Sequence, residues 1–114
     1  MENRIDIAKE YFKAFHDGKL EEVYTYFNDK GTIQYGTEQP APAEIFFPNS
    51  AELISTFKFE MHAIYSSKNS GNIIIHFSFH PKSDSNDITE AIDIIEFDEN
   101  DKITKILVIP NSKN

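Results

Sequence analysis

The chain contains no cysteine among its 114 residues, so it forms no disulfide and offers no thiolate to a metal or a substrate. It also lacks any apolar stretch as long as a membrane-spanning helix requires. Its first residues are charged and amphipathic, without the apolar core of an export signal. A cytoplasmic location is therefore expected.

Basic residues are scarce as well. Lys and Arg together number 11 against 19 Asp and Glu, which gives a formal net charge of −8. Proteins that bind nucleic-acid backbones or anionic membranes cluster their basic residues, whereas those of this chain are scattered singly. We expect neither a nucleic-acid nor a membrane partner. Gly-rich phosphate loops, nucleophile elbows and HExxH motifs are also missing, and no cofactor is expected.

Apolar and aromatic residues, in contrast, are plentiful. Hydrophobic residues make up 39% of the chain and include ten Phe and five Tyr, a composition that excludes disorder. A chain of this length can bury one sizeable core but not two. With no internal repeat and no linker-like segment, residues 1–114 are predicted to form a single domain.

The first part of the chain predicts two helices joined by a tight turn. Residues 3–16 place their apolar side chains on one half of a helical wheel and their charged side chains on the other. Gly18 follows as a natural C-terminal stop. Residues 19–29 repeat apolar side chains at helical spacing, so a second helix is expected there, completing a helical hairpin.

The next segment changes its period and then carries several prolines. Residues 31–36 alternate as in a short strand. Three prolines fall within residues 40–48, which predicts a loop or a single helical turn. Asn49 or Ser50 is placed to cap a short third helix, with Glu52 completing a capping box.

Four longer strands are predicted in the rest of the chain. The alternating segments are residues 57–65, 73–80, 88–97 and 102–109. Short polar turns connect them, as in antiparallel hairpins. The whole pattern predicts an α+β domain with its helices packed on one face of a curved antiparallel sheet. In the first long strand, the predicted inward face holds Phe57, Phe59, Met61, Ala63 and Tyr65.

One carboxylate interrupts an otherwise apolar face in the segment AIDIIEF. Asp93 alternates with Ala91 and Ile95, so it points into the core if those residues do. A carboxylate in that position must be hydrogen-bonded or protonated. Tyr11, near the centre of the apolar half of the first helix, has a hydroxyl that also needs a partner. The residues leave three interpretations open: a ligand-facing pair, a structural hydrogen bond in the core, or Asp93 turned to solvent.

Three segments carry a resemblance to a known family. They are AKEYFKAFHDGKLEEVYTYFND as an opening helical hairpin, KGTIQYG as a first strand and AIDIIEFDENDKITKI as a final hairpin. The chain resembles the nuclear transport factor 2-like (NTF2-like) superfamily, in the branch of SnoaL-like and ketosteroid isomerase-like proteins. The resemblance implies an NTF2-like, or cystatin-like, cone with a pocket between helices and sheet. It fails mainly in the segment TEQPAPAEIFFPNSAELIST, and it is specific for fold rather than for function.

Residue by residue, the resemblance implies only part of an active site. Tyr11 falls at the position of the isomerases' oxyanion-hole tyrosine, and Asp93 falls where they keep a protonated aspartic acid. Where they place the aspartate that moves the proton, this chain has Tyr35, a poor base because a tyrosine has a reference pKa of about 10. Glu38, in the following loop, is an alternative base. Whether the protein is an enzyme is left open.

The leading hypothesis is a protein that binds a small, mostly apolar molecule in a central cavity, with Tyr11 and Asp93 as polar anchors. Two alternatives remain: an isomerase- or dehydratase-type enzyme with a non-standard base, and a non-catalytic dimerisation or partner-binding module with a filled interior. A cavity on the order of a few hundred Å³ reached by both anchors would favour ligand binding or catalysis. The residues expected to line it are Phe15, Tyr35, Phe59, Met61, Phe77 and Ile95.

Histidines gather on the opposite face of the predicted sheet. His62 is expected to lie opposite His76, with Glu60 and His80 on the same surface, and such a group could coordinate zinc. Exposed histidines on a wet or subunit-facing surface explain the same pattern. No metal is expected.

Four isoleucines are also predicted on that outer face. They are Ile64, Ile74, Ile92 and Ile94. Such residues on an otherwise wet face indicate burial against a second subunit, so a homodimer through the sheet is expected.

Overall fold

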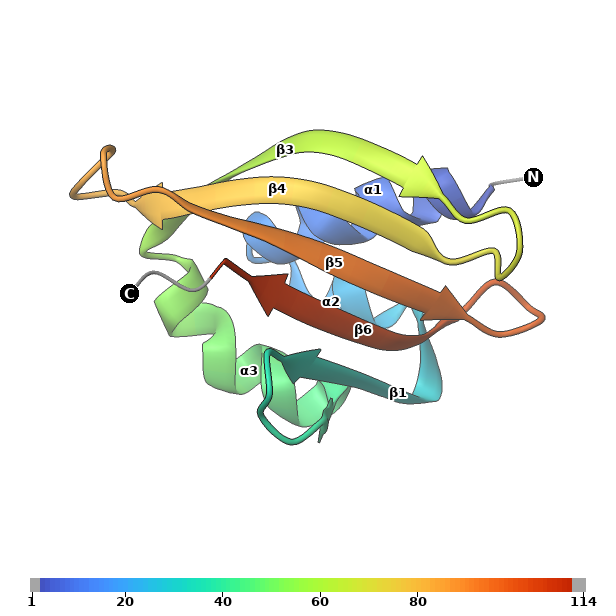
Figure 1. Ribbon diagram of the computed structural model, residues 1–114. Helices are drawn as coiled ribbons and strands as arrows, with labels where there is room; N and C mark the ends of the chain where they lie inside the picture. Colours follow the sequence, from blue (N-terminus) through green and yellow to red (C-terminus); the bar gives the residue numbers. More distant parts are fainter. Residues whose placement is uncertain (1–2, 112–114) are drawn as a thin grey trace.

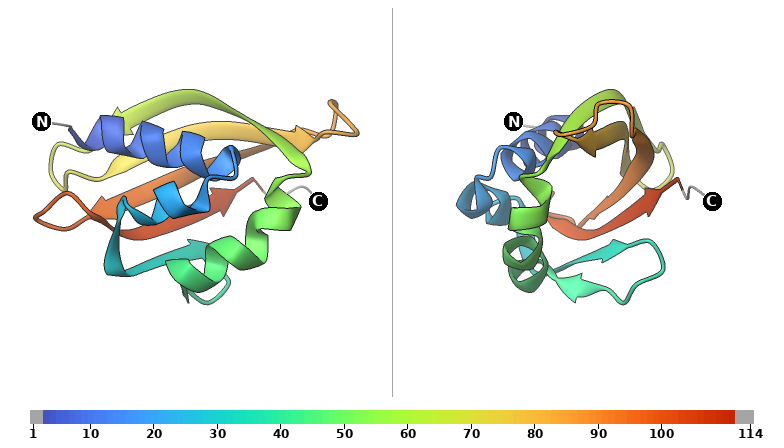
Figure 2. Two further views of the ribbon diagram at one scale, coloured as in Figure 1. Left: turned by 180° about the vertical axis from the view of Figure 1, so that it is seen from behind. Right: turned by 90° about the vertical axis from the view of Figure 1, so that its left-hand side faces the viewer.

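Within residues 3–111, which the computed structural model describes, six strands form one curved, unclosed sheet and three helices cover one of its faces (Figure 1). Across the sheet the strands follow the order β2-β1-β6-β5-β4-β3. Figure 2 shows the sheet bending around one side of the molecule while the helices close the other. The elements are α1 (Arg4–His16), α2 (Leu20–Tyr24), β1 (Phe27–Tyr35), β2 (Ala41–Pro42), α3 (Ala43–Ile54), β3 (Phe57–Ser66), β4 (Ile73–Pro81), β5 (Thr89–Phe97) and β6 (Ile103–Pro110).

The predicted α+β architecture is confirmed. Strands β3 to β6 pair antiparallel in sequence order, as their polar turns predict. Strand β1 lies on the other side of β6 and runs parallel to it, so the sheet is mixed. A parallel pair requires a long crossover, and here α3 and strands β3 to β5 lie between β1 and β6 along the chain. The core fills the space between the helices and the concave face of the sheet.

Helix α1 forms where its amphipathic pattern predicts. The side chain of Asn3 accepts a hydrogen bond from the backbone N–H of Asp6 at 2.9 Å, which caps the helix start. Gly18 has a φ of 78°, a left-handed conformation that ends the helix at low cost. The side chains that α1 buries are Ala8, Tyr11, Phe12, Ala14 and Phe15.

The second helix is shorter than predicted. It ends at Tyr24, and the chain is already in β1 at Phe27. Phe27 pairs with Ile103 of β6 and is buried, with its ring 5.7 Å from that of Tyr11. Burial of this aromatic residue in the core therefore overrides the helical spacing of residues 19–29.

The third helix begins earlier than predicted. It starts at Ala43, so the proposed cap at Asn49 or Ser50 is wrong, and Pro48 lies within the helix. No side-chain hydrogen bond caps its start. Phe47 is fully buried and packs edge-on against Phe15 and Phe27. That burial offsets the backbone hydrogen bond that Pro48 removes.

A β-bulge in β3 changes which side chains face inwards. The register shifts between Met61 and Ala63, so Ala63 rather than His62 pairs with His76. Beyond the bulge every side chain changes face. Ile64 therefore packs against the core, and Tyr65 is 58% exposed. The predicted inward position of Tyr65 and outward position of Ile64 are both wrong.

Candidate functional site

Asp93 points into the interior from the middle of β5, as its position in AIDIIEF predicts. Its backbone pairs with Ile75 of β4 and Val108 of β6, and the residue is only 4% exposed. Burial in these apolar surroundings raises the pKa of Asp93 from its ordinary 3.8 to about 7. The carboxyl group is therefore partly protonated at neutral pH, and the solvent-facing interpretation is excluded.

Tyr11 approaches the same space from α1. It is 2% exposed, and its ring packs near those of Phe15, Phe27 and Phe47. Burial raises the pKa of its hydroxyl well above the ordinary value, and the charge of Asp93 raises it further. Tyr11 and Asp93 form no hydrogen bond with each other or with another described side chain, so a structural core bond does not explain the pair.

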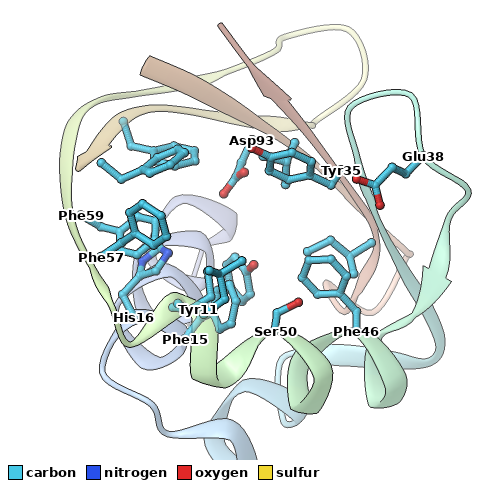
Figure 3. A pocket seen from close by; sticks show the side chains of 16 residues that line it. Tyr11, Phe15, His16, Tyr35, Glu38, Phe46, Ser50, Phe57, Phe59 and Asp93 are labelled. Atoms are coloured by element: carbon cyan, nitrogen blue, oxygen red, sulfur yellow. The ribbon is translucent and has the colours of Figure 1, made fainter. Parts of the chain in front are cut away.

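A cavity of about 360 Å³ lies between the helices and the sheet, and both residues line it. Figure 3 shows the Asp93 carboxylate pointing into it from the sheet, with Tyr11 across from it on the helix side. Of the lining residues expected from the sequence, Phe15, Tyr35, Phe59 and Phe77 are present. Other lining side chains come from β1, α3, β3, β4, β6 and the loop after β1: Ile33, Glu38, Phe46, Ser50, Leu53, Ile54, Phe57, Phe79 and Val108.

Two of the expected lining residues lie elsewhere. Ile95 is fully buried in the core between β4 and β6, and it does not reach the cavity. Met61 packs at the margin of the core, next to the bulge of β3, and is also outside the lining. Alternation in a strand predicts the face of a residue but not the position of a cavity along that face.

Polar side chains stand at one end of the cavity. Tyr35 is 36% exposed, and Glu38 is exposed beside it on the loop after β1 (Figure 3). Partial burial raises the pKa of Tyr35, and the negative charge of Glu38 adds to this effect. Ser50, from α3, lines the same cavity. This end is the mouth of the cavity, and it carries a carboxylate outside the aromatic interior.

His16 is a cavity residue that the sequence reasoning missed. It occupies the last turn of α1 and lies beside Phe57 and Phe59, at the end away from Glu38 (Figure 3). Burial lowers the pKa of His16 from 6.5 to about 3. The signal in the sequence is its spacing: His16 lies four residues after Phe12, on the edge of the apolar face of α1. Because histidine is a polar residue type, the sequence did not identify His16 as part of the apolar face.

The described residues contain no group of three or more His, Asp or Glu side chains placed to hold a metal ion. On the outer face, the histidines instead contact neighbouring polar side chains, and His62 Nδ1 lies 3.7 Å from a carboxylate oxygen of Glu60. His62 shares a hydrogen bond with Ser78 at 2.7 Å, and His76 shares one with Glu90 at 3.0 Å. Within residues 3–111, no helix has the length and apolar character needed to cross a membrane.

No protein-family model matches the chain, and no curated protein matches its sequence significantly. Solved structures do match its fold. An NTF2-like protein of unknown function from Cytophaga hutchinsonii superposes with a TM-score of 0.79 at 13% identity, over 97% of this chain and 92% of that one. A steroid delta-isomerase from Pseudomonas aeruginosa superposes with a TM-score of 0.78 at 16% identity, over 98% of this chain and 82% of that one.

A third structure superposes with a TM-score of 0.75 at 17% identity. It is the epoxide hydrolase/cyclase-like enzyme SalBIII, which has a role in pyran ring formation in the polyether salinomycin. The match covers 95% of this chain and 90% of that chain. Other matching structures are described as having a cystatin-like fold. At these identities the likeness establishes the fold alone. The chain has the NTF2-like, or cystatin-like, fold, as the resemblance in its sequence implies.

Proposed function

We propose that the protein binds a small, mostly apolar molecule in the central cavity and holds an oxygen atom of that molecule between Tyr11 and Asp93. The observation that carries the proposal is a pair of buried polar side chains that line one cavity without a hydrogen bond to any described group. Their oxygen atoms are reached from the cavity rather than sealed in the core, so a ligand that fills the cavity can pair with them and gain affinity.

The remaining lining sets the class of ligand. Most of it is Phe, Ile, Leu and Val, which gives affinity to apolar and aromatic surfaces. The cavity volume of about 360 Å³ lies at the lower end of the range for small-molecule sites. A compact, flat molecule with few polar atoms fits these conditions.

Binding is proposed in preference to isomerase chemistry because of Tyr35. This residue occupies the position at which the resemblance implies the proton-moving aspartate. Burial and the neighbouring Glu38 both raise the pKa of Tyr35. A phenol with a raised pKa is an even poorer base at neutral pH. The isomerase and cyclase among the structural neighbours have the same fold, but fold likeness does not transfer a reaction.

Two related compounds test the oxygen contact. Naphthalene and 2-naphthol share a flat apolar ring system, and only 2-naphthol carries an oxygen. We expect 2-naphthol to bind more tightly, and we expect its Kd to increase about tenfold in Tyr11→Phe and in Asp93→Leu, because each change removes one hydrogen-bonding group in a mostly apolar cavity. Fluorescence titration measures both affinities.

The matched control is Tyr65→Phe, which removes the hydroxyl of a tyrosine exposed on β3. It should leave both Kd values unchanged. Naphthalene binding should also remain the same in Tyr11→Phe, because the phenyl ring and the cavity shape are kept. Equal affinity of the wild-type protein for the two compounds, or absence of binding, would contradict the proposal.

A further inference from the structure

The side chain of His16 lines the same cavity, and the contacts proposed for Tyr11 and Asp93 do not explain why a histidine is there. Its ring stacks on Phe59 with centroids 3.8 Å apart and planes 19° apart, and it lies edge-on to Phe12 at 4.1 Å. These contacts are those of an aromatic core residue. A phenylalanine would make all of them without placing ring nitrogens in an apolar environment.

The polar atoms of His16 are not satisfied by the protein. Its Nδ1 is excluded from solvent and lies near the backbone carbonyl of Phe12, short of full hydrogen-bond geometry. Its Nε2 has no hydrogen-bond partner among the described residues and is not sealed from the cavity. Buried polar atoms in folded proteins nearly always have partners, so an unpaired one requires an explanation. Because His16 also lines the cavity, a ligand in that cavity can contact the ring.

The charge state of His16 restricts what such a ligand can be. Burial holds the pKa of this residue near 3, so the imidazole is neutral under physiological conditions. A neutral imidazole has one N–H donor and one acceptor nitrogen. It does not attract an anion by charge, and the phenyl rings of Phe57 and Phe59 around it disfavour charged groups. A hydroxyl group both donates and accepts, so it pairs with either tautomer.

We propose that His16 is a second polar contact of the cavity and that the ligand is a flat, uncharged aromatic molecule carrying a hydroxyl group at the His16 end as well as an oxygen at Tyr11 and Asp93. This inference rests on the proposed function and specifies its ligand class. The aromatic side chains contact the faces of the ring system, while polar groups at its two ends contact the two polar sites. His16 thus selects aromatic molecules with two oxygens over those with one.

The dihydroxynaphthalenes test this selection against 2-naphthol. We expect the 2,6- or the 2,7-isomer to bind the wild-type protein about tenfold more tightly than 2-naphthol, because the second hydroxyl gains a hydrogen bond at His16. His16→Phe keeps an aromatic ring of similar size and removes both nitrogens. In that variant the gain should disappear, so that the diol and 2-naphthol bind with Kd values within about twofold of each other.

A spectroscopic measurement on the wild-type protein removes any dependence on how the variant folds. The ring ¹⁵N signals of His16 should shift when the tighter-binding diol is added and should move little with 2-naphthol. His62, His76 and His80 lie outside the cavity lining and serve as internal controls.

The outcomes separate this inference from the function on which it rests. If 2-naphthol binding depends on Asp93 but the diols show no gain, or a gain that persists in His16→Phe, the role of His16 is overturned and the proposed function stands. Unchanged His16 signals on binding of a diol would overturn it in the same way. If none of the compounds binds, both proposals fail.

Discussion

Burial acts in opposite directions on the pKa values of two side chains that line the cavity, Asp93 and His16. It raises the pKa of Asp93 to about 7 and lowers that of His16 to about 3, because in each case the charged form is disfavoured. Near neutral pH the cavity therefore holds a partly protonated acid and an uncharged imidazole. These two groups make stability depend on pH in ways that can be separated.

Asp93 should lower stability as the pH rises. Between about pH 4 and pH 7 the folded state keeps a proton that the unfolded state loses, so the free energy of unfolding falls by about 1.4 kcal/mol per pH unit from this group alone. Above pH 7 the loss is complete. Asp93→Asn removes this contribution. Urea titrations across the range should show the variant gaining stability relative to wild type as the pH increases.

His16 provides the opposite profile as an internal check. Its folded pKa lies below the unfolded value of 6.5, so the unfolded state binds the extra proton and stability falls as the pH drops from about 6.5 to 3. His16→Phe should therefore gain stability relative to wild type on acidification. If the free energy of unfolding depended on pH in the same way in the wild type and in both variants, neither group would be buried in this way.

Arg4 connects the start of α1 to two turns at one end of the sheet. Its guanidinium donates hydrogen bonds to Asp101 at 2.7 Å and to the backbone carbonyls of Gly71 and Asp98 at 3.1 Å each. It also lies 5.1 Å from the ring centroid of Phe97. These contacts join the β3–β4 and β5–β6 turns to α1, so Arg4 fixes the helix that carries Tyr11 and His16.

Arg4→Ala should lower the free energy of unfolding by about 2 kcal/mol, because two backbone carbonyls and a carboxylate lose a charged donor. Chemical denaturation measures the change. The control is Lys13→Ala, which removes the exposed ion pair of Lys13 with Asp17 on the same helix. Exposed pairs of this kind contribute little, so the control should unfold almost as the wild type does. Equal effects of the two changes would show that Arg4 has no special anchoring role.

At the scale of elements, local patterns predict what local forces decide. The amphipathic wheel of α1, its stop at Gly18 and the alternation of β4 to β6 are all visible in the sequence and present in the structure. The start of α3 and the end of α2 differ from their predicted positions, because both depend on the contact of Phe27 with Phe47 in the core. Contacts between residues far apart in sequence leave no local signal, so those boundaries could not be predicted.

Only some residues of the cavity have a local signal in the sequence. Tyr11 and Asp93 stand out as single polar residues on apolar faces, and this contrast identifies them from the sequence alone. Glu38 is foreseeable only through its closeness to Tyr35 in the sequence. His16 belongs to a polar-looking helix end, and its place at the cavity follows from how α1 and β3 come together, which depends on the packing of the whole molecule.

At the scale of the whole molecule, the outer face of the sheet carries a row of apolar side chains. Tyr65, Ile74, Ile94 and Leu107 pair across β3, β4, β5 and β6 in register. Ile92 and Ile109 form a second pair beside this row, and Ile109 is 42% exposed. Because Ile64 faces inwards, the outer face differs from the one predicted, but its central isoleucines remain.

We expect two copies of the chain to pair through this face, because a two-fold axis near Ile94 would bring the same apolar row of each copy together. Ile94→Glu places a charge at its centre and should convert a dimer into a monomer in light scattering at micromolar concentration. Ile45→Glu makes the same change at an isoleucine that is 51% exposed on α3, across the molecule, and should leave the mass unchanged. A monomeric wild-type protein, or dimers that persist in Ile94→Glu, would place the subunit contact elsewhere or remove it. Because the cavity lies between the helices and the inner face of the sheet, pairing through the outer face does not cover it.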